Sequence, residues 1–216
     1  MLRPFKLERY FALHEFSARY LLSASDVESL SMQELLALAD ADSLSRWQSL
    51  SLGYTESLGL PALRAEIAAL YQKVGIETIL TLAPEEGIFI TMHTLLKPGD
   101  HVISIFPAYQ SLYEIGRSLG CEVSPWKLVL KEGRWALDFV ALASCLKPNT
   151  RLLVVNFPHN PSGFLPTRKE LEQLIAFVRE HRLYLFSDEM YRFLEYDPAL
   201  RLPRQVMPKP PKGGGK

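Results

Sequence analysis

The sequence contains little cysteine and no long apolar run, and these two absences exclude whole classes of protein. Cys121 and Cys145 are the only cysteines among 216 residues, too few for the disulfide framework of a small secreted domain. No stretch of about 18 apolar residues is present, so no membrane-spanning helix is expected. The charged N-terminus lacks the apolar centre of a signal peptide. We therefore expect a cytoplasmic protein in a reducing compartment.

An excess of charge of one sign is also missing. The 24 Lys and Arg residues balance 24 Asp and Glu residues, so no overall field favours nucleic acid or an anionic membrane surface. The five histidines show no metal-ligand spacing. Neither a phosphate-cradling glycine loop nor a Ser-His-Asp signature occurs. We expect no nucleic-acid, membrane or metal partner.

Hydrophobic residues make up 48% of the chain, which is enough for a well-filled core. Short apolar runs of strand length, at 101–106, 151–156 and 184–188, alternate with helical segments. Strands separated by helices form βαβ units. The sequence therefore predicts an α/β fold with a doubly wound, mostly parallel sheet and helices on both faces.

Local signals mark where several helices begin and end. Capping boxes open helices at Ser31 and Thr167, and Pro61 and Pro84 suit the first position of two others. Gly120 is typical of a left-handed helix end. The expected packing faces are Leu63, Ile67, Leu70, Tyr71 and Val74 after Pro61, and Ile88, Phe89, Met92, Leu95 and Leu96 after Pro84.

The loops that follow the three strands carry unusual residues. An aromatic residue stands in the segment 106–109, an asparagine lies between two prolines in 156–163, and Asp188 ends an apolar strand. An unpaired carboxylate at such a buried position is costly. Ligands of doubly wound sheets bind beyond the carboxyl ends of the strands. We therefore expect the chemistry of the protein in these loops.

Taken together, the motifs resemble the pyridoxal-phosphate enzymes of fold type I, specifically the class I and II aminotransferases. The matching residues are 54–64, 98–100, 107–109, 156–163 and 188–191, in the order of the family. The resemblance implies that residues 51–200 form an incomplete cofactor-binding large domain. It implies that residues 1–50 are a helical segment of the small-domain and substrate region.

The resemblance implies a role for each residue of these loops. Asp188 matches the aspartate that pairs with the pyridine nitrogen of pyridoxal 5'-phosphate. Asn160 and Tyr191 match the two residues that bond the ring's 3-oxygen. Tyr109 matches the aromatic residue that stacks on the ring face.

The phosphate end departs from the family pattern. Its binding site is expected at the helix that begins near Pro84, with backbone contacts from Ala83 and Glu85. Proline donates no N–H, and acids beside a phosphate are unhelpful unless they point away. Tyr54 resembles the tyrosine that reaches the phosphate of a partner subunit, which implies a homodimer in the full-length form.

The lysine that family members join to the cofactor as a Schiff base matches no residue of this sequence, so no catalytic residue is assigned. Residues 201–216 hold four prolines, three glycines and five basic residues. We interpret them as an irregular, non-native tail of a chain truncated before that lysine. We then expect weak cofactor binding, no normal turnover, and an exposed sheet edge prone to aggregation.

The function that the resemblance implies is transfer of an amino group between an amino acid and a 2-oxo acid, with pyridoxal phosphate as cofactor. Two alternatives remain open: a pyridoxal-phosphate C–S lyase of the same fold, and a non-catalytic binding or interaction remnant. A generic nucleotide-binding α/β domain ranks last, because the sequence has no glycine fingerprint.

Overall fold

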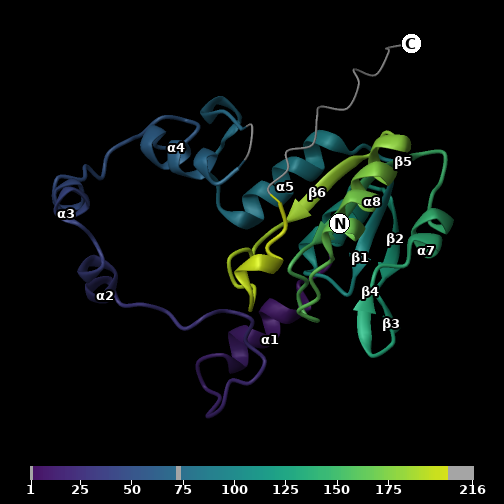
Figure 1. Ribbon diagram of the computed structural model, residues 1–216, viewed down its shortest axis with the longest axis horizontal. Helices are drawn as coiled ribbons and strands as arrows, with labels where there is room; N and C mark the ends of the chain where they lie inside the picture. Colours follow the sequence, from purple (N-terminus) through teal and green to yellow (C-terminus); the bar gives the residue numbers. More distant parts are fainter. Residues whose placement is uncertain (1, 72–73, 204–216) are drawn as a thin grey trace.

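A four-stranded parallel sheet forms the centre of the computed structural model, which describes residues 2–71 and 74–203 (Figure 1). The strands lie in the order β2-β1-β5-β6, and all three neighbouring pairs are parallel. Their bounds are β1 His101–Phe106, β2 Glu122–Lys127, β5 Thr150–Asn156 and β6 Tyr184–Asp188. The expected mostly parallel sheet is confirmed, and its strands at 101–106 and 184–188 have the expected bounds.

Helices cover both faces of this sheet, as the doubly wound prediction requires. On one face lie α5 (Pro84–Leu95) and α6 (Ser111–Ser118), and on the other lie α7 (Phe139–Ser144) and α8 (Arg168–Glu180). Alternate residues of a strand point to opposite faces. Val102, Leu152 and Val154 accordingly pack toward α5 and α6, whereas Ile103, Ile105, Leu153 and Val155 pack toward α7 and α8.

The expected helix signals at three sites are present in the structure. Ser31 opens α2 (Met32–Ala37) and Thr167 opens α8, each with both bonds of a capping box. Gly120, just after α6, has a φ of +84°, a conformation that residues with a Cβ rarely adopt.

Two features of the sheet region were not predicted. The outer strand β2 contains Pro125, which has no N–H to donate and is tolerated because β2 lies at an edge. Its inward residue, Trp126, is buried and donates its Nε1–H to the Asp138 carbonyl at 2.8 Å. A hairpin of β3 (Val129–Lys131) and β4 (Arg134–Ala136) follows. Short strands with proline and charged residues lack the apolar run that identifies the central strands.

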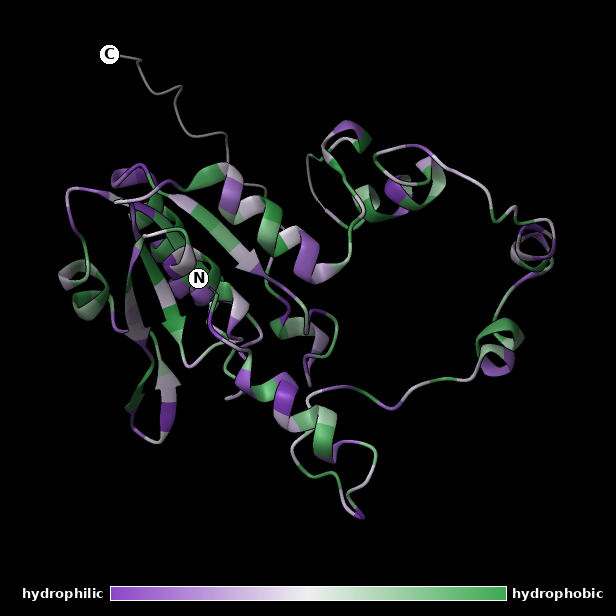
Figure 2. Cartoon of the chain, turned by 180° about the vertical axis from the view of Figure 1, so that it is seen from behind, coloured by the Kyte–Doolittle hydropathy of each residue, from purple (hydrophilic) through white to green (hydrophobic). Residues whose placement is uncertain are grey.

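Residues 15–60, here called the N-terminal arm, extend away from the sheet and contain α2 and α3 (Ala41–Gln48) (Figure 1). The arm follows α1 (Lys6–His14) and leads through α4 (Pro61–Ala69) and the short η1 (Ile76–Thr78) to α5. Hydrophobic residues occur along the arm as well as in the sheet (Figure 2). Several large ones are exposed, including Phe16, Leu22, Leu52 and Tyr54.

Two predictions about helix packing were wrong in part: Ile88, Met92 and Leu96 are buried as expected, but other members of the two predicted faces are exposed. Leu63 and Leu70 of the α4 region are 49% and 38% exposed, and Phe89 of α5 is 45% exposed. The buried residue of α4 is instead Arg64, whose Nε and Nη2 donate to the carbonyls of Ile79 and Ile76 at 2.8 and 2.6 Å. An apolar stripe shows which side of a helix prefers burial, but it does not supply a surface to cover it.

The C-terminal part ends with η2 (Pro198–Leu200), after which Arg201 pairs with Glu195 at 3.1 Å and Leu202 packs against the α8 side of the core. From residue 204 onward, the predicted non-native tail lies outside the described residues. The division at residues 50 and 200 stays a prediction. Among residues 2–71 and 74–203, no helix combines the length and apolar character needed to cross a membrane.

The burial of β5 predicts where substitutions cost stability. Leu153 is 0% exposed between the sheet and α8, so Leu153→Ala should lower the free energy of unfolding by about 2–5 kcal/mol. Leu130 of the hairpin is 65% exposed, and Leu130→Ala should cost less than about 1 kcal/mol. Urea unfolding followed by circular dichroism measures both. Equal losses in the two variants would contradict this assignment of the core.

Candidate active site

A cleft of about 570 Å³ lies where β5 and β6 end, at the edge where parallel-sheet ligands bind. Residues of helix α1 and of the first turns of α5 also line it. Its lining residues are Leu7, Glu8, Phe11, Ser25, Ala83, Pro84, Glu85, Ile88, Tyr109, Asn156, Asn160, Phe186, Ser187, Asp188, Met190 and Tyr191. Six of the seven sequence-predicted site residues are therefore brought together here.

Asp188 enters the cleft because of its place in the alternation of β6. Tyr184 and Phe186 pack on the α5 side of the sheet, so the side chain of Asp188, two residues further on, points to the same side. Its Oδ1 accepts a hydrogen bond from the Met190 N–H at 3.0 Å. Burial raises the pKa of this carboxyl above its ordinary value, against the opposing effect of the hydrogen bonds that it accepts.

Asn160 and Tyr191 meet although 31 residues separate them in the sequence. The Asn160 Nδ2 donates to the Tyr191 hydroxyl oxygen at 3.1 Å. Because that oxygen accepts, the Tyr191 hydroxyl hydrogen remains available to donate, and the Asn160 amide keeps a second N–H. Two hydrogen-bond donors, the Asn160 amide and the Tyr191 hydroxyl, therefore lie side by side in the cleft. Together they can bind one acceptor oxygen of a ligand.

Asn156 joins the loop after β5 to the end of β6, and the sequence reasoning gave it no role. Its Oδ1 accepts from the Asn160 backbone N–H at 2.8 Å, and its Nδ2 donates to the Asp188 carbonyl at 3.2 Å. The Phe157 N–H donates to that same carbonyl at 3.0 Å. The buried side-chain amide of Asn156 thus fixes the backbones of Asn160 and Asp188 relative to each other. Its place as the last residue of an apolar strand is the signal that marks it in the sequence.

Tyr109 lines the cleft from the β1–α6 loop and is held by the N-terminal segment. Its hydroxyl donates to Glu8 Oε1 at 3.1 Å, and its ring contacts Phe5 edge-on with centroids 4.6 Å apart. Burial, together with the Glu85 and Glu8 carboxylates, raises the pKa of this hydroxyl above its ordinary value. Glu8 and Phe5 lie about one hundred residues away in the sequence, and no local pattern indicates the contact.

The first turn of α5 presents Ala83 and Glu85 to the cleft, where free N–H groups of a helix start attract anions. Pro84 supplies no N–H, and the Glu85 carboxylate is engaged by the Ser111 hydroxyl at 2.8 Å. Glu86 faces a different hollow, beside Arg3 and Phe5. None of the described residues lining the cleft is Lys, Arg or His. The backbone contacts expected from Ala83 and Glu85 stay a prediction.

Tyr54 is the one predicted site residue that the fold does not bring to the cleft. It is fully exposed on the N-terminal arm and does not line the cleft. This position leaves its side chain free to meet another molecule, and the role expected of it in a partner's site stays a prediction.

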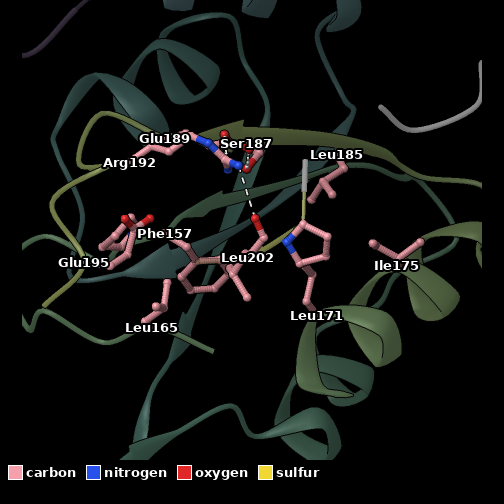
Figure 3. A pocket seen from close by; sticks show the side chains of 12 residues that line it. Phe157, Leu165, Leu171, Ile175, Leu185, Ser187, Glu189, Arg192, Glu195 and Leu202 are labelled. Atoms are coloured by element: carbon pink, nitrogen blue, oxygen red, sulfur yellow. Dashed lines mark hydrogen bonds and ion pairs between the residues drawn. The ribbon is translucent and has the colours of Figure 1, made fainter. Parts of the chain in front are cut away.

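A second pocket, of about 180 Å³, lies against the α8 side of β6 (Figure 3). Its floor is apolar, with Leu171, Ile175 and Leu185 among its residues. Arg192 crosses it and donates to the Leu202 carbonyl at 3.1 Å (Figure 3). Leu185 and Asp188 point to opposite faces of β6, so the side chain of Asp188 does not line this pocket, although Ser187 lines both pockets.

Comparison with known proteins identifies the family of the chain. The sequence profile of a family described as aminotransferase class I and II matches residues 22–211, which is most of the chain. The chain belongs to this aminotransferase family. A crystal structure of a PLP-dependent aminotransferase from Streptococcus suis 89-1591 covers 94% of the chain at 33% identity, with a TM-score of 0.83. The chain covers 54% of that structure.

Curated relatives within the aminotransferase family match a shorter part of the chain. The aspartate/prephenate aminotransferase of Thermus thermophilus is 33% identical over 162 residues, which are 72% of this chain and 42% of the relative. Kynurenine--oxoglutarate transaminase 1 of Mus musculus is 33% identical over 160 residues, 67% of this chain and 38% of the relative. The chain thus spans about two fifths of the length of these relatives.

The raised pKa of Asp188 predicts a pH-dependent stability. Between 3.8, the ordinary pKa, and the raised value, the folded chain binds more protons than the unfolded chain. Its free energy of unfolding must therefore decrease as pH rises through that window. Asp188→Asn removes the titrating group, so the variant should be more stable than the wild type at about pH 7, with a difference that shrinks toward about pH 4.

Urea unfolding at a series of pH values measures this difference. Asp26→Asn, at an exposed position of the N-terminal arm, is the matched control and should show no such dependence. A difference between wild type and Asp188→Asn that does not change with pH would contradict the assignment.

Proposed function

We propose that this chain is the ring-binding part of a cytoplasmic, pyridoxal-phosphate-dependent aminotransferase. One observation carries the proposal: three loops bring Asp188, Asn160, Tyr191 and Tyr109 into one cleft at the carboxyl edge of the sheet. In the whole protein, the reaction is transfer of an amino group between an amino acid and a 2-oxo acid. The named relatives act on different amino acids, so the proposal extends to this substrate class and no further.

The donor set of the cleft fits the pyridine ring of the cofactor. A protonated ring nitrogen needs an acceptor, and the half-buried Asp188 carboxylate lies in the cleft without a cationic side chain among the described lining residues. A ring oxygen needs donors, and the Asn160 amide and the Tyr191 hydroxyl stand together. A flat ring needs an aromatic neighbour, for which Tyr109 is available.

When bound, pyridoxal phosphate supplies an electron-accepting ring that stabilises negative charge at the α-carbon of an amino acid. The residues of this chain set the conditions for that chemistry. Burial disfavours the negative charge of the Asp188 carboxylate, so a positively charged partner stabilises it. Asp188 therefore favours the protonated form of the ring nitrogen. Asn160 and Tyr191 orient the ring through its oxygen, and Tyr109 excludes water from one ring face.

The phosphate end of the cleft fits the cofactor less well. The start of α5 offers backbone N–H groups, but Glu85 adds negative charge and no described lining residue adds positive charge. We propose that groups beyond this chain complete the phosphate site and supply the lysine that acts as general base. The chain by itself then binds the ring weakly and does not turn over substrate.

Binding of pyridoxal phosphate to the purified chain tests this function. Titration followed by visible circular dichroism should show a signal from the bound ring. Asp188→Asn should weaken binding by about tenfold or more, because a charge-assisted hydrogen bond is lost. The same substitution raises stability at neutral pH, so its opposite effects on binding and folding distinguish a binding role from damage to the fold.

Asp26→Asn is the matched control for this titration, and it should bind as the wild type does. The absence of any ring signal in the wild-type chain, or equal affinities of the two Asp→Asn variants, would overturn the proposal. Repeated turnover of an amino acid with 2-oxoglutarate by this chain would contradict the assigned need for an external lysine.

We also propose that the N-terminal arm contacts a second subunit, so that the whole protein is a homodimer. The arm exposes several large hydrophobic side chains, Tyr54 among them, in a pattern typical of an interaction surface. Tyr54 is then placed to reach the cofactor phosphate in the partner's cleft.

Sedimentation velocity over a range of concentrations tests this assembly. Leu52→Asp places a charge on the arm and should raise the dissociation constant of a dimer by about tenfold or more. Ser51→Asp, at the neighbouring exposed position, is the control and should have a smaller effect. A monomer at all concentrations, or equal effects of the two variants, would contradict the proposal.

A further inference from the structure

His159 lies in the middle of the loop 157–163, and its side chain is almost completely buried, at 2% exposed. It does not line the cleft. Its Nε2 lies 2.8 Å from the Pro107 carbonyl oxygen of the β1–α6 loop, and its Nδ1 lies 2.7 Å from the Ser162 hydroxyl. One imidazole therefore connects two loops that follow different strands.

The partners of this imidazole determine where its proton is. A carbonyl oxygen only accepts, so Nε2 carries the hydrogen and donates it to Pro107. Nδ1 then accepts the Ser162 hydroxyl hydrogen, and the Ser162 oxygen accepts the Phe164 N–H at 3.2 Å. Burial lowers the pKa of His159, which favours the neutral ring that this arrangement uses.

The link to Pro107 lies between two groups of the cleft. Tyr109 is two residues after Pro107, and Asn160 directly follows His159. The pairing of β1 with β5 reaches only as far as Ser104 beside Val154, before either loop begins. Among the described residues, no second hydrogen bond joins 107–110 to 157–163. The separation of the two loops therefore depends on this contact and on packing.

We propose that His159 is a positioning residue, which sets the distance between Tyr109 and Asn160 and so the width of the slot that receives a pyridine ring. The proposal rests on the proposed function, because the slot has a purpose only when a ring enters it. His159 acts through the Pro107 carbonyl and touches neither ring nor substrate.

The loop's own fold does not require this contact across the cleft. The His159 N–H donates to the Phe164 carbonyl at 2.9 Å, and the Gly163 N–H donates to the His159 carbonyl at 2.7 Å. Both bonds use backbone atoms and persist when the side chain changes. A substitution at 159 can therefore separate the two loops while each keeps its internal bonds.

Two amide variants distinguish positioning from a merely local role. The nitrogen of a glutamine side chain reaches about as far as Nε2 of histidine, so His159→Gln keeps a donor for Pro107. Asparagine reaches only as far as Nδ1, so His159→Asn keeps a partner for Ser162 and loses the link between the loops. His181→Asn, at the exposed end of α8, controls for the substitution itself.

Titration with pyridoxal, and separately with pyridoxal phosphate, measures ring affinity in each variant. His159→Asn should weaken binding of both probes by about tenfold, because a buried hydrogen bond is lost. His159→Gln should stay within about threefold of the wild type, and His181→Asn should match it. Equal affinities of the Asn and Gln variants at 159 would overturn the proposal.

Amide hydrogen exchange without any ligand gives a second readout, which does not depend on the proposed function. In His159→Asn, exchange should become faster in 107–112 as well as in 157–164, and in His159→Gln it should not. Faster exchange confined to 157–164 would overturn the proposal even if the ring binds. Faster exchange in both loops, with no ring bound by the wild type, would support the link between the loops and contradict the proposed function alone.

Discussion

The parallel pairing of β5 with β6 is the constraint on which the rest of the site depends. It holds Asn156 beside Asp188 in register, so the two polar residues that end these strands lie side by side. The Asn156 amide then has Asp188 and Asn160 within reach of its two ends. A shift of one residue would turn Asp188 to the α8 face and away from Asn160 and Tyr191.

The candidate site has an excess of negatively charged side chains. Asp188, Glu8 and Glu85 place three carboxyl groups around a cleft that has no cationic side chain among its described lining residues. Such a cleft attracts positive charge, and burial, which raises the pKa of Asp188, disfavours the charged form of this carboxyl. The same arrangement disfavours a phosphate, so under the proposed function the ring and the phosphate of the cofactor would meet opposite electrostatic conditions on this chain.

The N-terminal segment contributes to the site from a great distance in the sequence. Phe5 and Glu8 hold Tyr109 by an aromatic contact and a hydrogen bond, and Arg3 pairs with the buried Glu114 of α6 at 3.4 Å. Beyond α1, the chain leaves the body of the protein and exposes its hydrophobic residues along the N-terminal arm. One short segment therefore connects the cleft to the surface that we assign to a partner.

The sequence by itself determined the central strands, the capped helix starts and the residues of three loops, because apolar period, capping chemistry and motif are all local. Only the tertiary structure decided what covers each element, which is why Phe89 is exposed, Arg64 is buried and β2 escaped prediction. The contacts of Glu8 with Tyr109 and of His159 with Pro107 belong to the same class. These contacts join residues far apart in the chain, and no local sequence pattern determines which distant residue will form the contact.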